Sequence, residues 1–182
     1  MKHYVRGFRT AALALTLGLG SMWAANAQAA NNTGIGKLYF GVKGGLMMND
    51  VGGFGDAINI GGIVGAPVSH MPQGTISVEG ELTTTLSKGD VNYFGYTGNW
   101  DITTLAGYGV FRTNGPMYLK AKAGYLFEDV SVSIGGLRGY GSDSGLSFGV
   151  GGGMRLAGGH RIEIEYTVIE SDVNFLSIGY NF

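Results

Sequence analysis

A chain of 182 residues has room for a single domain. It contains no cysteine and only three histidines, which excludes disulfides and a thiol nucleophile, and we expect no metal or other cofactor. Its twelve Lys and Arg and thirteen Asp and Glu form no basic patch, so we expect no nucleic-acid partner.

The first thirty residues have the layout of a secretory signal peptide. Three Lys and Arg among the first nine residues precede an apolar stretch at 11–19 and a tail of small residues. The stretch is shorter than the ~20 residues of a membrane-spanning helix, and A-x-A cleavage fits after Ala27 or Ala29. We therefore expect residues 1–29 to be a cleaved signal peptide. Residues 30–182 form the mature domain, whose net charge is −4.

The mature chain alternates apolar residues with polar residues or glycine. This pattern predicts β-strands, because successive side chains of a strand point to opposite faces. The alternation occurs in eight segments: 38–48, 58–65, 75–86, 100–111, 119–128, 146–156, 161–168 and 173–182. In segment 100–111 we place Trp100 on the apolar face and Asp101 on the polar face, with Leu105 and Phe111 breaking the rule.

Charged residues within these segments share the polar face. A soluble β-sandwich also alternates, with its apolar face inward. Segments of about ten residues suit tilted membrane-crossing strands better, and an even strand number is usual in bacterial barrels. We therefore predict an all-β fold, an eight-stranded antiparallel transmembrane β-barrel. The residues predicted to form an ion-pair network in its lumen are Lys43, Glu79, Glu81, Asp101, Lys120, Lys122, Glu128, Arg155, Arg161, Glu163 and Glu165.

The connections between the segments also alternate. Residues 113–116 and 157–160 form tight turns, whereas 48–56, 87–98 and 129–144 are longer and rich in Gly, Ser, Asp and Tyr. Short periplasmic turns and long outer loops are typical of outer-membrane barrels. Two connections depart from this rule: 67–73 is a longer periplasmic one, and the outer loop near Ser171 is short.

The last segment, Val173–Phe182, ends in an aromatic residue. Together with the signal peptide and the eight amphipathic strands, it makes the sequence similar to small outer-membrane β-barrel proteins of the OmpA/OmpX and opacity-protein type, often labelled the porin family. The resemblance covers the whole mature chain and implies a location in the cell outer membrane. It also implies that Tyr180 and Phe182 form the signal that the barrel-assembly machinery reads.

The lumen of eight strands is just wide enough for side chains to fill it. Five basic and six acidic candidates are nearly balanced, which favours an ion-paired interior; a narrow solute pore is the alternative. The run Gly149–Gly153 lies within a strand and lacks the spacing of a phosphate-binding loop. We expect its small residues to make room for long neighbouring side chains.

We expect a structural or interaction role in which outer loops contact lipopolysaccharide or other partners, with the barrel a monomer in outer-membrane lipid. The aromatic loop segments 90–96 and 134–140 fit either recognition or an aromatic girdle at the membrane surface. A lipid A-modifying enzyme is the alternative. Its Ser–His mechanism needs the two groups within hydrogen-bond reach, and His70 and His160 fall in predicted periplasmic turns, so we expect no enzyme.

Overall fold

The structure is a computed structural model that describes residues 36–93 and 95–182. The predicted signal peptide, with its cleavage positions after Ala27 and Ala29, lies outside the described residues. The strands are β1 (Tyr39–Asn49), β2 (Ala57–Met71), β3 (Gly74–Ser87), β4 (Gly89–Tyr93), β5 (Tyr96–Thr113), β6 (Met117–Ile134), β7 (Leu137–Arg155), β8 (Arg161–Val168) and β9 (Val173–Asn181). A short 3₁₀ turn, Ala157–Gly159, joins β7 to β8.

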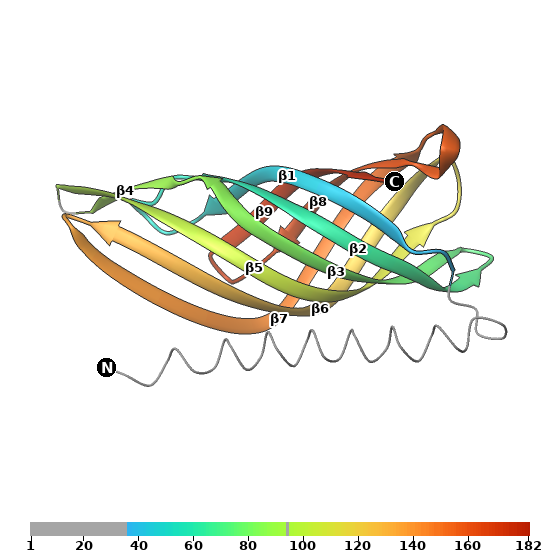
Figure 1. Cartoon of the computed structure of the whole chain (residues 1–182), viewed down its shortest axis with the longest axis horizontal. Coiled ribbons are helices and arrows are strands. Elements are labelled where there is room, and N and C mark those ends of the chain that lie inside the picture. The colour runs from blue at the N-terminus through green and yellow to red at the C-terminus, as the bar shows by residue number, and fades with distance from the viewer. Residues whose placement is uncertain (1–35, 94) are drawn as a thin grey trace. The chain divides into compact units, whose positions relative to one another are not determined.

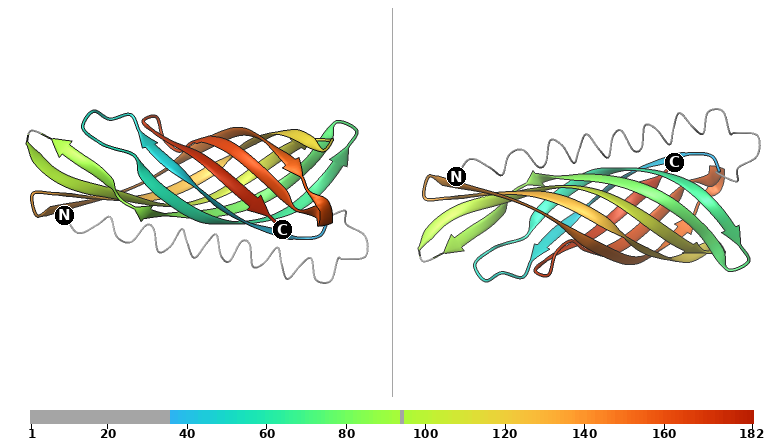
Figure 2. Two further views of the ribbon diagram at one scale, coloured as in Figure 1. Left: turned by 90° about the horizontal axis from the view of Figure 1, so that it is seen from above. Right: turned by 90° about the horizontal axis from the view of Figure 1, so that it is seen from below.

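The strands close into a barrel, as Figure 1 and Figure 2 show. The sheet runs in the order β3-β2-β1-β9-β8-β7-β6-β5-β4, and an additional pairing of β3 with β5 closes it. Every pairing is antiparallel, including the one between β1 and β9. Within the described residues, eight strands form the wall, and the short β4 extends it by pairing with the start of β5. The predicted eight-stranded antiparallel barrel is confirmed.

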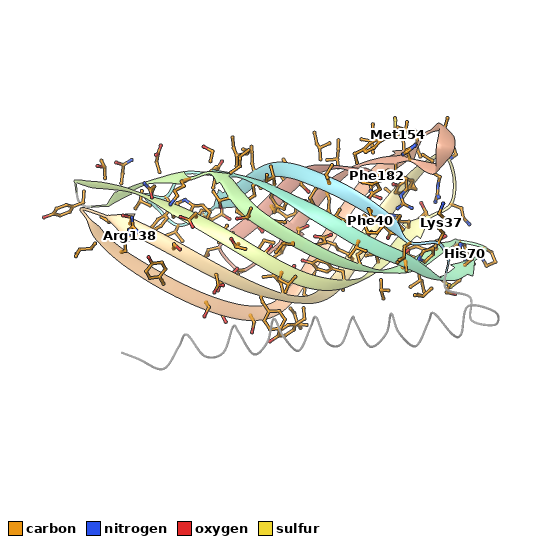
Figure 3. The ribbon with its side chains drawn as sticks, viewed as in Figure 1. Lys37, Phe40, His70, Arg138, Met154 and Phe182 are labelled. Atoms are coloured by element: carbon orange, nitrogen blue, oxygen red, sulfur yellow. The ribbon has the colours of Figure 1, made fainter. Side chains whose placement is uncertain are left out.

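The two ends of the barrel differ. At the turn end lie the connections at 72–73, 114–116 and 156–160, together with Gly36 and Phe182. At the hairpin end lie the β1–β2, β3–β5, β6–β7 and β8–β9 connections. Figure 3 places Arg138 at the hairpin end and Lys37 and His70 at the turn end.

The connection predicted as a loop over 129–144 is instead a β-hairpin. β6 and β7 pair as far as Ile134 and Leu137, and only Gly135 and Gly136 lie between them. Both glycines have positive φ, 57° and 85°, the conformation that a tight two-residue hairpin turn requires. The segment 87–98 likewise contains β4 and the start of β5. These strands therefore continue well past the segments that the alternation marked.

The outward face of the barrel is apolar on most strands. Val42, Leu82, Leu119 and Ile178 are all between 54% and 70% exposed, and similar residues recur around the wall. A continuous apolar outer surface is what a lipid-facing band requires. The alternation therefore predicted the lipid-facing side correctly on these strands. In the described part of the chain, no helix is long and apolar enough to cross a membrane.

β5 faces the opposite way from our prediction. Its interior residues are Trp100, Ile102, Ala106, Tyr108 and Val110, each at most 3% exposed. Asp101 instead points outward near the hairpin end, where it pairs with Lys88 at 2.6 Å and both side chains reach solvent. Apolar residues occur on both faces of β5, so alternation alone could not identify the interior. This reversal turns Arg112, two residues beyond Val110, into the lumen.

Candidate functional site

The interior holds a compact cluster of ion pairs, which we call the lumen cluster. Its members come from β1, β3, β5, β6 and β8 and are Lys43, Glu79, Glu81, Arg112, Lys120, Lys122, Glu163 and Glu165. Their side chains are 0–4% exposed. Four cations and four carboxylates balance each other, so the cluster is neutral. Buried charges are tolerated when they are paired in this way.

One half of the lumen cluster is built around Glu81 and Glu165. Lys43 Nζ lies 2.6 Å from Glu81 Oε2 and 3.2 Å from Glu165 Oε1. Lys122 Nζ bridges the same two carboxylates at 2.8 and 2.7 Å. Thr167 donates a further hydrogen bond to Glu165 at 2.9 Å. The four charges thus form a closed ring across the barrel.

The other half is built around Arg112. Its guanidinium donates to Glu163 through Nε at 2.7 Å and to Glu79 through Nη2 at 2.5 Å. The hydroxyl of Tyr39 donates to Glu79 at 2.6 Å, and that of Tyr118 donates to Glu163 at 2.7 Å. Charge-assisted hydrogen bonds of this kind are roughly twice as strong as neutral ones.

Lys120 joins the two halves. Its Nζ lies 2.7 Å from Glu165, 3.0 Å from Glu163 and 3.2 Å from Glu79. Because three carboxylates share one ammonium, the cluster is a continuous network and not a set of separate pairs.

Glycines of β7 make room for these long side chains. Gly151 lies between Lys120 of β6 and Glu165 of β8 in the strand register, and Gly149 lies opposite Lys122. A Cβ atom added to Gly149 would stand 2.7 Å from Cε of Lys122. The glycine run that the sequence analysis assigned to lumen packing therefore lies beneath the ion pairs.

Toward the hairpin end the interior is apolar. Trp100, Met47, Ile102 and Phe175 are at most 1% exposed and belong to one hydrophobic cluster with neighbouring interior residues. Trp100 is held by a hydrogen bond from its Nε1 to the carbonyl oxygen of Gly55 at 2.7 Å. An ion-paired layer and an apolar layer therefore both fill the lumen of the described chain.

The structure brings seven of the eleven predicted lumen residues into the lumen cluster and leaves four outside it. Asp101 lies on the outer face. Arg155 is exposed at the turn end, where its Nε donates to the carbonyl oxygen of Gly115 at 3.0 Å. Arg161 lies over the ring of Tyr39, 4.2 Å from its centroid, and forms no ion pair with a described residue.

Glu128 is the fourth residue outside the cluster. It points inward from β6 and is 3% exposed, but no Lys or Arg of the described chain lies within ion-pair distance. Its Oε2 also lacks a hydrogen-bond partner among those residues. Glu128 is thus a buried carboxylate without the compensation found in the lumen cluster.

Arg112, the cation around which the second half of the lumen cluster is built, was not among the predicted lumen residues. It directly follows Phe111, the last residue of the predicted segment 100–111, so neither face was predicted for it. The signal was present in the sequence, since an arginine is very costly on the lipid face of a barrel strand. Applying that cost to the whole strand would have corrected its orientation.

Charge is separated along the barrel. The hairpin end carries two cations, Lys88 and Arg138, and nine carboxylates: Asp50, Asp56, Asp90, Asp101, Glu128, Asp129, Asp143, Glu170 and Asp172. The turn end carries Lys37, Arg155 and Arg161. In the loop before β9, burial and the nearby carboxylate of Asp143 raise the pKa of Glu170. The hairpin end therefore has a large excess of acidic residues and the turn end an excess of basic ones, whereas the lumen cluster is neutral.

The two aromatic residues predicted as the assembly signal lie at the turn end, on the outer face. Tyr180 and Phe182 are 38% and 55% exposed, and Tyr180 stacks on His160 with ring centroids 5.6 Å apart. Phe182 exchanges backbone hydrogen bonds with Phe40 of β1, at 2.8 and 3.2 Å. The terminal strand is thereby fastened at the seam where the barrel closes.

The comparisons with known proteins agree with this architecture. A family model described as the outer membrane protein beta-barrel domain matches residues 11–182. A similar solved structure is Ail, the attachment invasion locus protein of Yersinia pestis, in complex with the heparin analogue sucrose octasulfate. It is 17% identical with a TM-score of 0.51, over 83% of this chain and 100% of that one.

A second similar structure is the Neisserial surface protein A, NspA. It is 13% identical with a TM-score of 0.55, over 81% of this chain and 97% of that one. At such identities the likeness shows the fold alone. No curated protein matches the sequence. Because the family model spans nearly the whole chain, the protein belongs to the family of the outer membrane protein β-barrel domain.

Proposed function

We propose that this outer-membrane barrel is an interaction protein whose hairpin end binds a partner outside the membrane. The observation that carries the proposal is the sheet formed there by β4, β5, β6 and β7. β7 pairs with β8 only from Arg155 to Phe148, whereas it pairs with β6 as far as Leu137. Residues 137–147 therefore present one unpaired edge within the described chain, and such an edge can accept an extended strand from a partner.

Side chains on this sheet suit recognition. Tyr96, Leu137 and Tyr140 are 64%, 80% and 75% exposed near the tips of the hairpins. Aromatic side chains are enriched at protein interfaces because they supply large contact areas. These exposed tip residues favour a role in recognition rather than a role in an aromatic girdle at the membrane surface. They lie on strands that extend beyond the barrel closure.

The charge of the hairpin end indicates the kind of partner. Apart from the buried Glu128, eight carboxylates against two cations favour a basic protein surface through electrostatic complementarity. Lipopolysaccharide carries anionic phosphates, so Lys88 and Arg138 are the hairpin-end residues that could form ion pairs with it. Heparin-like ligands, such as the analogue in the Ail complex, are equally anionic, so the acidic hairpin end does not favour them.

Neither catalysis nor conduction is part of this proposal. His160 is stacked on Tyr180 at the turn end, away from the outer sheet. The lumen cluster and the apolar layer fill the space that a solute would need. We further propose that the barrel is a monomer surrounded by outer-membrane lipid, and that Tyr180 and Phe182 are read by the assembly machinery.

The test is to shorten the β6–β7 hairpin without changing the register in which β6 pairs with β7. Replacing residues 130–141 by Asn-Gly places a two-residue turn between Asp129 and Ser142, which already face each other in the β6–β7 ladder. The control replaces only Gly135 and Gly136 by Asn-Gly. In liposomes, the control should bind an oligolysine peptide and an immobilised basic protein as the native chain does, and the shortened variant should lose most of the protein binding. Equal binding by both variants would refute the proposal.

A further inference from the structure

The barrel wall has a side opening where β7 leaves β8. The ladder between them ends at Phe148 and Val168, but β7 continues along β6. A cavity of about 270 Å³ lies at this point, next to the β8–β9 connection. Its lining includes three acidic residues, Glu128, Asp143 and Glu170, and three apolar ones, Leu146, Phe148 and Val168.

A buried carboxyl group without an ion-pair partner in the described chain lies at the back of this cavity. Glu128 is 3% exposed and points into the cavity, and its Oε2 has no hydrogen-bond partner in the described residues. The carboxylates of Glu170 and Asp143 line the same cavity. Burying an unpaired carboxylate is costly, and each lumen-cluster carboxylate avoids that cost by pairing with Lys or Arg. A cation bound in the cavity would give Glu128 the pairing that the lumen-cluster carboxylates have.

The mouth of the cavity is apolar and faces sideways. Leu146 and Phe148 are 69% and 52% exposed on the outer face of β7, and Val168 lies on the outer face of β8. These side chains continue the lipid-facing surface of the barrel. A ligand that enters from the lipid side therefore meets these apolar side chains first and the buried Glu128 behind them, whereas Asp143 and Glu170 are exposed.

We propose that this side cavity binds a membrane amphiphile through a positively charged ammonium headgroup. The ammonium pairs with Glu128 at the back of the cavity, with Asp143 and Glu170 adding negative potential. The hydrocarbon chain lies along Leu146, Phe148 and Val168. Charge complementarity selects the headgroup, and the position on the lipid-facing wall selects a ligand with a chain. The cavity shares residues 143–146 with the edge proposed for a partner of the outer sheet, but the inference does not require that partner to bind.

The proposal is tested on the purified mature barrel in neutral maltoside detergent, titrated with dodecylammonium by calorimetry. The native barrel should bind one equivalent saturably. Glu128→Gln should weaken binding about tenfold or more, since hydrogen bonds to charged groups are the strong ones. Asp90→Asn removes a carboxylate at the same end outside the cavity and should leave affinity within about twofold, which controls for uptake of the amine by micelles.

Two further probes separate the possible ligands. Methylammonium, which has the headgroup but no chain, should bind far more weakly; equal affinity would overturn the assignment to an amphiphile. Calcium should not displace dodecylammonium at equal concentration; displacement that is lost in Glu128→Gln would show a divalent-cation site instead. Unchanged affinity in Glu128→Gln would overturn the site itself. Heat-modifiable gel mobility verifies the fold of each variant, and Glu170→Gln, which changes an exposed carboxylate of the cavity lining, serves as a second variant with a smaller expected loss.

Discussion

Arg112 and Glu163 are joined by two hydrogen bonds, from Nε to Oε1 at 2.7 Å and from Nη2 to Oε2 at 3.1 Å. The same guanidinium also holds Glu79. Arg112→Met should therefore leave two buried carboxylates short of a cation and lower the free energy of unfolding by about 3–5 kcal/mol. Urea unfolding in lipid vesicles measures this loss.

Arg138→Met serves as the control for that measurement, because Arg138 is exposed at the hairpin end. It should change the unfolding free energy by less than ~0.5 kcal/mol. If Arg112→Met unfolded no more easily than the control, the lumen cluster would not stabilise the barrel in the way the geometry indicates.

Gly151→Leu tests the space beneath the ion pairs. Its side chain would project between Lys120 and Glu165 and separate them, at an expected cost of roughly 1–3 kcal/mol for overpacking. Gly107→Leu is the matched control, because a Cβ there has no heavy atom within 4 Å and the position faces outward. The same unfolding assay compares them. Equal losses of unfolding free energy in the two variants would show that replacing a strand glycine is responsible, and not the separation of Lys120 from Glu165.

Conduction is tested by planar-bilayer recording. Because the lumen cluster and the apolar layer fill the interior, the native barrel should give no stable conductance. A steady single-channel current that changes with Lys120→Ser or Glu81→Ser would contradict the filled interior and favour the solute-pore alternative.

The raised pKa of Glu170 predicts a pH-dependent effect on stability. Burial and Asp143 favour the protonated form in the folded state, so the ionised carboxylate weakens the fold at pH values above its folded-state pKa. Glu170→Gln should raise the thermal midpoint slightly at pH 8, and this difference should vanish as the pH falls below the ordinary glutamate pKa of about 4.3. A difference that is constant between pH 8 and pH 4 would contradict the assignment.

Membrane integration is tested by fractionation. The apolar outer face predicts that the mature protein stays in the membrane fraction after a carbonate wash and changes its gel mobility on heating. Release by carbonate would contradict the membrane-spanning assignment of the wall strands.

Much of the barrel could be predicted from local patterns. Alternation at a period of two is set by backbone geometry, so it identified the strands and the charged face of most of them, including Lys43, Glu81 and Glu165. It could not set the ends of the strands, because Val130 and Val132 continue a strand through a segment rich in glycine and serine. It also misplaced β5, on which apolar residues occupy both faces.

By itself, the sequence predicted the export signal, and it determined the eight-strand count and seven of the eight charges of the lumen cluster, since each depends on neighbouring residues or on composition. Only the tertiary structure decided which charges meet. Arg112 reaches Glu163 from a strand 51 residues away, and Glu128 points inward yet meets no cation of the described chain. Barrel closure and strand register control these distances, and neither is encoded in a local period.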